Sequence, residues 1–199
     1  MKQIISILLV FSVLTAGAQS VTSRAVPQDL VTDDSTYWTI STLSTLSYVN
    51  TTPGAWYNTT RSGGGMIVHF KFKPNGRFIF QLYMQSNSYG SSLEAWTEVE
   101  GSVQFTRDAK GQDIFVTRAE KGTYRTNRNG VLGSRPIPED ELKGQHSCTY
   151  LWQKTEFADD PSHYYLLTVD LEKYPDADVN KAGTIDPAWI SKFHIPKKS

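Results

Sequence analysis

The clearest pattern in the chain is an alternation of apolar and polar side chains on both sides of Pro74-Asn75-Gly76. One face of the alternation is apolar throughout and comprises Met66, Val68, Phe70, Phe72, Phe78, Phe80, Leu82 and Met84. The opposite face is mostly polar or mixed. The glycine of the separating tripeptide supplies the positive φ that a tight turn requires. The pattern therefore predicts an antiparallel β-hairpin with one buried face.

Weaker patterns of the same kind recur at hairpin spacing along the chain. They predict strands at residues 37–49, 93–105, 113–118, 122–126, 150–155 and 164–171. Gly101 interrupts one of these strands, which predicts a bulge or a sharp bend. We expect a turn at Lys121-Gly122 and a loop over residues 128–144, apart from one helical turn at 138–142. About eight strands at this spacing fit a β-sandwich or an up-and-down β-barrel.

The N-terminus has the pattern of a secretory signal peptide. Met1-Lys2-Gln3 precedes an apolar run from Ile4 to Leu14, and the small residues Ala16-Gly17-Ala18 follow it. We expect cleavage after Ala18 and export to the periplasm or out of a bacterial cell. The apolar run is shorter than the roughly 20 residues of a transmembrane helix, so no membrane span is expected in the mature chain. No cysteine directly follows the run, so we do not expect a lipoprotein.

Beyond the signal peptide of residues 1–18, the chain divides into two further parts. Residues 19–35 are polar and are expected to form a flexible lead-in. Residues 36–199 are expected to form one β-rich domain with a helical tail at its C-terminus. The helix signal is Asp186-Pro187, which matches an N-cap followed by proline at the first helical position.

Charge and cysteine content remove several classes of function. The 20 basic and 20 acidic residues give a net charge of zero. The chain therefore lacks the excess of clustered Lys and Arg that neutralises nucleic-acid phosphates, and we expect no nucleic-acid partner. Cys148 is the only cysteine, so the domain has no intramolecular disulfide. We interpret Cys148 as a small buried hydrophobic residue.

No motif for catalysis or metal binding is present. The four histidines, His69, His146, His163 and His194, show no pair at metal-ligand spacing. Glu94, Glu98 and Glu100 lie on one face of a single strand, which favours a solvated face over a catalytic pair. Residues 178–189 match a calcium loop only in part, because Trp189 replaces the final carboxylate. We therefore expect neither an enzyme nor a cofactor or metal.

Aromatic residues are the remaining candidates for binding. The six that we single out are Trp56, Tyr57, Tyr83, Trp96, Tyr124 and Trp152. Those on predicted strands either line a barrel interior or its mouth, or belong to the hydrophobic core. Trp56 and Tyr57 lie in the glycine-flanked segment 50–65, where no strand pattern buries them. They are expected to act as a lid or a stacking surface.

Several segments together resemble a lipocalin-like, calycin-type family of small exported bacterial proteins. The likeness covers residues 36–171 and rests on short motifs: Tyr37-Trp38, the Gly-rich loop, Phe70-Lys71-Phe72-Lys73-Pro74-Asn75-Gly76-Arg77-Phe78, Glu100-Gly101-Ser102-Val103 and Gly122-Thr123-Tyr124-Arg125. The resemblance implies an antiparallel up-and-down β-barrel of about eight strands. It also implies an interior that holds a small apolar ligand, without naming one.

Two functions from different classes follow from the sequence. The first is a non-enzymatic binding protein that carries a small apolar or amphipathic ligand inside a β-barrel. The alternative is a cell-envelope interaction protein whose loop aromatics recognise a glycan or a protein surface. A weaker third option is an enzyme whose site is assembled from scattered residues. A hollow barrel favours the first function, and a barrel packed with side chains favours the second.

Overall fold

The computed structural model describes residues 25–33, 35–43, 63–88 and 91–197 of the chain. Its strands are β1 (Trp38–Leu43), β2 (Gly63–Lys73), β3 (Arg77–Ser88), β4 (Ser91–Arg107), β5 (Asp113–Arg128), β6 (Val131–Pro136), β7 (Thr149–Phe157), β8 (Asp160–Asp170) and β9 (Ser191–Pro196). A short helix, α1 (Glu139–Gln145), lies between β6 and β7, and a 3₁₀ helix (Pro187–Trp189) precedes β9.

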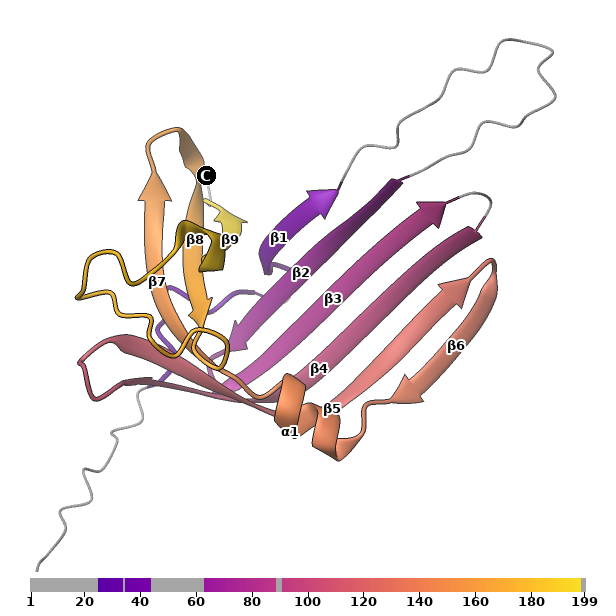
Figure 1. Ribbon diagram of the computed structural model, residues 1–199, viewed down its shortest axis with the longest axis horizontal. Helices are drawn as coiled ribbons and strands as arrows, with labels where there is room; N and C mark the ends of the chain where they lie inside the picture. Colours follow the sequence, from indigo (N-terminus) through magenta and orange to yellow (C-terminus); the bar gives the residue numbers. More distant parts are fainter. Residues whose placement is uncertain (1–24, 34, 44–62, 89–90, 198–199) are drawn as a thin grey trace, which may run out of the picture.

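Eight of the nine strands close into a ring in chain order (Figure 1). Each strand pairs antiparallel with the next, and β9 closes the ring by pairing with both β8 and β1. Strand β6 lies outside the ring and pairs with β5. This arrangement confirms the predicted all-β fold, an antiparallel barrel of up-and-down topology. Among the residues that the structure describes, no helix is long and apolar enough to cross a membrane.

The predicted hairpin is present as β2 and β3. Gly76 has a φ of 72° in the turn, a value that glycine adopts readily. The register places Phe72 opposite Phe78 and Met66 opposite Met84, so the apolar positions of both strands share one face. We call this face, which packs on the barrel core, the inner face, and the opposite one the outer face.

Aromatic rings fill the barrel. Phe70 lies at their centre, with ring centroids of neighbouring residues 5.3 to 6.2 Å away. Those neighbours come from β2, β3, β5, β7 and β9 and are Phe72, Phe78, Phe80, Phe115, Tyr150 and Phe193. Burial of such large side chains supplies most of the stability of a domain that has no disulfide.

The N-terminal segment completes this core. Residues 25–33 belong to the expected lead-in, yet Val26 and Leu30 are 5% and 0% exposed. The indole Nε1 of Trp38 donates a hydrogen bond to the Leu30 carbonyl oxygen at 3.0 Å. A parallel bridge also joins Val31 to Phe72 on β2. The described end of the lead-in is therefore part of the packed domain.

A close approach of two backbones bends β4 and β5. The ladder between them shifts register between Glu100 and Gly101, which confirms the predicted irregularity at Gly101, and the extra residue, Glu120, belongs to β5. A Cβ on Gly101 would lie 1.9 Å from the Arg118 carbonyl oxygen, so only glycine fits. The expected turn at Lys121-Gly122 is wrong, because β5 continues through these residues from Asp113 to Arg128.

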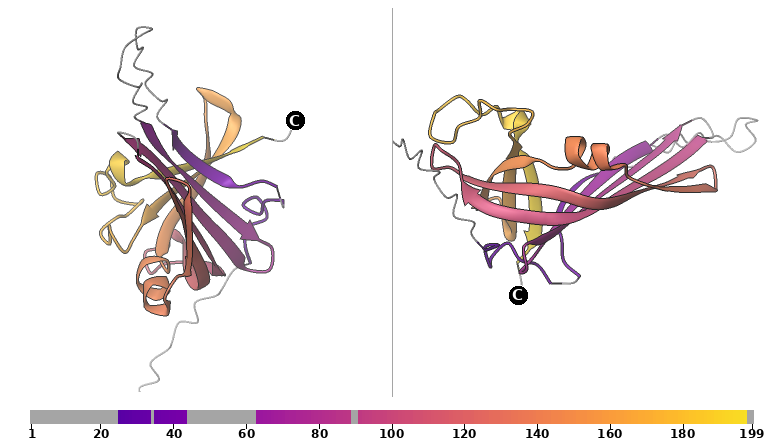
Figure 2. Two further views of the ribbon diagram at one scale, coloured as in Figure 1. Left: turned by 90° about the vertical axis from the view of Figure 1, so that its right-hand side faces the viewer. Right: turned by 90° about the horizontal axis from the view of Figure 1, so that it is seen from below.

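Beyond the bend, strands β2 to β5 continue past the ring as an open sheet, which β6 joins along β5. Residues 63–69, 81–88, 91–98, 122–128 and 131–136 of β2 to β6 form this part, which we call the extended sheet. Figure 2 shows it reaching away from the barrel. Strand β6 lies where a loop was expected, and all six of its residues are exposed.

The C-terminus departs from the expected helical tail. The Asp186 carboxylate accepts a hydrogen bond from the Ala188 amide at 2.8 Å and caps a helix, as predicted. That helix is a single 3₁₀ turn, however, and the chain then continues as β9. The residues of β9 become a strand because β8 and β1 offer them backbone partners on both sides.

The Gly101 contact predicts a large and local effect of one methyl group. We expect Gly101→Ala to lower the free energy of unfolding by about 2 kcal/mol or more, because the new Cβ clashes with backbone rather than with a movable side chain. Urea denaturation measures the change. Gly144→Ala is the control, since a Cβ there meets nothing within 4 Å and alanine favours the helix. Equal midpoints for Gly101→Ala and the wild type would contradict the account.

Leu30 and Leu132 form a matched pair for testing the buried N-terminal segment. Leu30 is 0% and Leu132 is 78% exposed. We expect Leu30→Ala to lower the free energy of unfolding by about 2–5 kcal/mol and Leu132→Ala by less than about 0.5 kcal/mol. Thermal or urea unfolding checks both. A loss of the same small size in both variants would show that the N-terminal segment is not part of the core.

Candidate functional site

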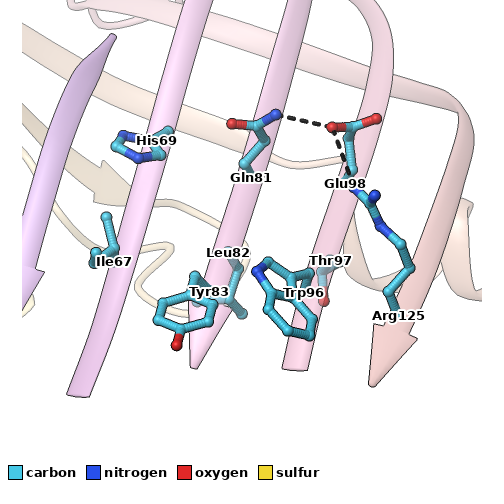
Figure 3. Close-up of a pocket in the computed structure, with 9 residues that line it drawn as sticks. All are labelled: Ile67, His69, Gln81, Leu82, Tyr83, Trp96, Thr97, Glu98 and Arg125. Atoms are coloured by element: carbon cyan, nitrogen blue, oxygen red, sulfur yellow. Dashed lines mark hydrogen bonds and ion pairs between the residues drawn. The ribbon is translucent and has the colours of Figure 1, made fainter. Parts of the chain in front are cut away.

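A hollow of about 450 Å³ lies on the outer face of the extended sheet (Figure 3). Strands β2, β3, β4 and β5 contribute its lining residues, which are Ile67, His69, Gln81, Leu82, Tyr83, Trp96, Thr97, Glu98 and Arg125. We call it the outer-face hollow. Its volume lies in the range of small-molecule binding sites, and its lining mixes aromatic, polar and charged groups.

The alternation of side chains along each strand brings seven of these residues together on the outer face, whereas Leu82 and Thr97 border the hollow from inner-face positions of β3 and β4. Two rows cross the sheet at right angles to the strands. The first contains Ile67, Tyr83, Trp96 and Arg125, and the second contains His69, Gln81 and Glu98. Each residue lies directly opposite the next in its row, at the separation where cross-strand side chains touch. The rows form because the β2–β3 turn and the β4–β5 ladder fix the register.

A chain of polar contacts links Gln81 and Glu98 of the second row to Arg125 of the first row. The Gln81 amide nitrogen Nε2 donates a hydrogen bond to Glu98 Oε2 at 2.8 Å. Arg125 Nη2 lies 3.9 Å from the same oxygen, and the Arg125 side chain is 55% exposed. Figure 3 shows this chain between the three strands. Glu98 is thus held in place with acceptor capacity left, and Arg125 keeps donors for a ligand.

Two aromatic rings lie beside this polar chain. The ring centroids of Tyr83 and Trp96 are 5.4 Å apart, with their planes tilted by 40°. The Tyr83 hydroxyl donates to Glu94 Oε1 at 3.3 Å, and Asn127 Nδ2 donates to Glu94 Oε2 at 2.9 Å. Burial and the nearby Glu94 carboxylate raise the pKa of Tyr83, so its hydroxyl stays protonated at neutral pH. The two rings therefore form a fixed aromatic surface with a polar border.

His69 lies at the β2 side of the hollow. Its Nδ1 is 2.9 Å from the Thr39 hydroxyl oxygen, and its ring centroid lies 5.1 Å from that of Tyr37. Burial lowers the pKa of His69 below the ordinary value of 6.5. The ring is therefore neutral at pH 7 and offers one donor and one acceptor rather than a positive charge.

The six aromatic residues singled out from the sequence lie in different places. Tyr83 and Trp96 lie together in the outer-face hollow. Tyr124 faces the other side of the sheet, where its hydroxyl lies 3.1 Å from His146 Nε2. Trp152 packs against Phe105 in the core at a centroid distance of 5.5 Å. The remaining two, Trp56 and Tyr57, lie outside the described residues.

Sequence reasoning did not single out seven of the nine lining residues, and these include the polar residues His69, Gln81, Glu98 and Arg125. The sequence contained a signal that could have placed two of them, His69 and Gln81, in one row. The turn at Pro74-Asn75-Gly76 fixes the hairpin register, which places His69 opposite Gln81. Arg125 gave no such signal, because its position opposite Trp96 depends on the bulge in β5.

A hollow inside the barrel is much smaller than the outer-face hollow. A hollow of about 50 Å³ lies where the inner face meets the end of α1, lined by Phe70, Phe78, Phe80, Val99, Thr117, Gln145, His146 and Tyr150. That volume holds a water molecule or two and not a ligand of several heavy atoms. The rings that surround Phe70 occupy interior space that a ligand inside the barrel would need.

Another polar cluster lies on β8 and does not form a catalytic triad. Ser162 Oγ and Asp160 Oδ2 both lie 2.9 Å from the same nitrogen, Nδ1 of His163. A triad needs the acid and the nucleophile on opposite nitrogens of the ring.

The Cys148 thiol is not activated as a nucleophile. Burial raises the pKa of this thiol, which disfavours the reactive thiolate.

The sequence raised two possible metal sites, one formed by histidines and one in the partial calcium loop of residues 178–189. Within the described ranges, no group of three His, Cys, Asp or Glu residues is placed to hold a metal ion. In the loop that partly matches a calcium site, the Asp178 carboxylate accepts the Asn180 amide at 2.9 Å and lies 3.7 Å from Lys110 Nζ. Its oxygens thus have partners within the protein.

No protein-family model, curated protein or solved structure matches this chain. The function proposed below therefore rests on the residues and distances of the outer-face hollow.

Three histidines predict how stability depends on pH. Burial lowers the pKa of His69, His146 and His194 below 6.5. The unfolded chain thus binds protons at higher pH than the folded protein, and protonation favours unfolding. Stability is fully present above about pH 6.5 and is lost as the pH falls through the lower folded-state pKa values. Urea midpoints at pH 7 and pH 5 check this expectation, and His69→Asn should reduce the loss. A midpoint that rises toward pH 5 would contradict it.

Proposed function

We propose that this protein is an exported, non-enzymatic binding protein that recognises a saccharide on the outer face of its extended sheet. The observation that carries the proposal is the pair Tyr83 and Trp96 beside the polar chain of Gln81, Glu98 and Arg125. A sugar ring has apolar C–H faces and a rim of hydroxyl groups. Aromatic rings pack against such faces, while carboxylate, amide and guanidinium groups bond to the hydroxyls.

The filled barrel favours recognition at the surface over carriage inside. The sequence led us to expect either an apolar ligand within the barrel or a glycan or protein surface bound by loop aromatics. The ring cluster around Phe70 leaves little interior volume, and the larger hollow lies outside. In our proposal the recognition residues are strand aromatics on rigid backbone, which position a ligand more accurately than a loop does.

The carboxylates support binding rather than cleavage. Glycoside hydrolysis generally uses two carboxyl groups on opposite sides of the scissile bond. Among the nine lining residues, Glu98 is the one carboxylate, and it is engaged by Gln81. Glu94 accepts hydrogen bonds from Tyr83 and Asn127, Glu100 pairs with Lys121 at 3.1 Å, and neither carboxylate lines the hollow.

Export and the lipocalin-like resemblance remain parts of the proposal. Both rest on the sequence, and the signal peptide of residues 1–18 lies outside the described residues. The up-and-down order of the ring agrees with a lipocalin-like ancestry. A saccharide ligand suits an exported protein, because the bacterial envelope and its surroundings are rich in glycans.

A matched pair of tryptophan variants tests the proposal. Trp96 and Trp189 are both half-buried and both lie against a tyrosine ring, Tyr83 and Tyr174 respectively. We expect the mature protein to bind at least one class of oligosaccharide on an array of neutral and acidic glycans. Titration calorimetry with that glycan should show an affinity loss of about tenfold or more, roughly 1.4 kcal/mol, for Trp96→Ala.

Trp189→Ala is the control and should keep the wild-type affinity within about threefold, roughly 0.7 kcal/mol. The proposal fails if the array shows no binding. It also fails if the two variants bind the glycan equally well.

A further inference from the structure

A second hollow adjoins the first on the same face. It measures about 480 Å³ and is lined by Trp96, Arg125, Thr126, Leu132, Gly133 and Ser134. Trp96 and Arg125 line both hollows. The second hollow extends the surface from β4 and β5 onto β6, the strand that lies outside the barrel ring.

The strand register shows that the two hollows follow one line. Trp96 lies opposite Arg125, and Arg125 lies opposite Ser134 on β6. The row that begins at Ile67 on β2 thus continues to the far edge of the sheet. Adjacent strands are about 4.8 Å apart, so the four intervals from β2 to β6 span roughly 19 Å. This length suits a chain of sugars better than a single ring.

The charges along this line favour an uncharged ligand. Arg125 is the one cationic residue in the two linings. Two carboxylates lie on the same face of β4: Glu94 takes hydrogen bonds from Tyr83 and Asn127, and Glu98 takes one from Gln81 and lies 3.9 Å from Arg125 Nη2. Two carboxylates beside one cation leave one negative charge in excess. An acidic sugar would meet like charge there, whereas a neutral one finds both donors and acceptors.

We propose that the two hollows are the halves of one track, and that its ligand is a neutral, extended, β-1,4-linked oligosaccharide lying across β2 to β6. This inference rests on the proposed saccharide-binding function. Chains of β-1,4-linked glucose or N-acetylglucosamine are flat ribbons with apolar ring faces, which match an open sheet face bearing aromatic rings. Trp96 lies at the midpoint and contacts both halves, while Leu132 and Ser134 provide the far end.

Chain length tests the track directly. Calorimetry of the mature protein compares cellobiose with cellohexaose and diacetylchitobiose with chitohexaose. We expect at least one hexasaccharide to bind about tenfold more tightly, or better, than its disaccharide, because only the longer chain occupies both halves. A β-1,4-linked mannuronate hexamer, which is acidic, should bind at least tenfold more weakly than that neutral hexasaccharide.

Two arginine substitutions on β6 give a matched control. Ser134 and Val131 are both exposed, but Ser134 lies on the outer face and Val131 on the inner face. Ser134→Arg places a long charged side chain in the far half of the track. It should reduce hexasaccharide affinity about tenfold and leave disaccharide affinity within threefold. Val131→Arg adds the same charge to the same strand and should change neither.

The outcomes separate this inference from the function on which it rests. A hexasaccharide that binds no better than its disaccharide overturns the track, as do equal effects of Ser134→Arg and Val131→Arg. Equal affinity for the acidic hexamer overturns the neutral ligand class. If neither neutral hexasaccharide binds while another glycan binds in a Trp96-dependent manner, this inference fails and the proposed function stands. If no glycan binds, both fail.

Discussion

The contact between Gly101 and the Arg118 carbonyl oxygen is the constraint on which the two halves of the molecule depend. A Cβ at Gly101 would lie 1.9 Å from that oxygen, so the backbones of β4 and β5 can meet there only without a side chain. The meeting point shifts the ladder and bends both strands. On one side of the bend the strands curl into a closed ring. On the other side they continue as an open sheet, whose outer face carries the outer-face hollow.

Side chains alternate between the two faces of every strand, and this alternation has a different result on each side of the bend. In the ring, inward positions hold rings that pack around Phe70 and leave about 50 Å³ free near α1. In the extended sheet, outward positions place Tyr83, Trp96 and Arg125 in one row across the strands. A small domain without a disulfide needs its interior for stability. Because side chains fill the interior, the residues that contact a ligand in our proposal lie on the outer face.

Local patterns predicted the parts of the fold that local interactions stabilise. The hairpin of β2 and β3 followed from its alternation and its turn, and the bulge followed from Gly101. Strand β9 could not be predicted in this way, because its short sequence becomes extended through pairing with β8 and β1, which lie far away in the chain. Lys121-Gly122 looks like a turn locally, yet the ladder to β4 keeps it in a strand. The candidate site shows the same limit: Trp96 was singled out by residue type, whereas Arg125 required the register across the bulge.

The central claim is that recognition takes place on the outer face and not inside the barrel, and indole signals test it most directly. Trp38 is 1% exposed, and its Nε1 is hydrogen-bonded to Leu30 within the core, whereas Trp96 lies in the outer-face hollow. A two-dimensional ¹H–¹⁵N NMR titration of the mature protein with its glycan follows both indoles in one experiment. The account predicts a progressive shift of the Trp96 indole signal and a constant Trp38 signal. A shift of Trp38 with an unchanged Trp96 would contradict it and place the ligand inside the barrel.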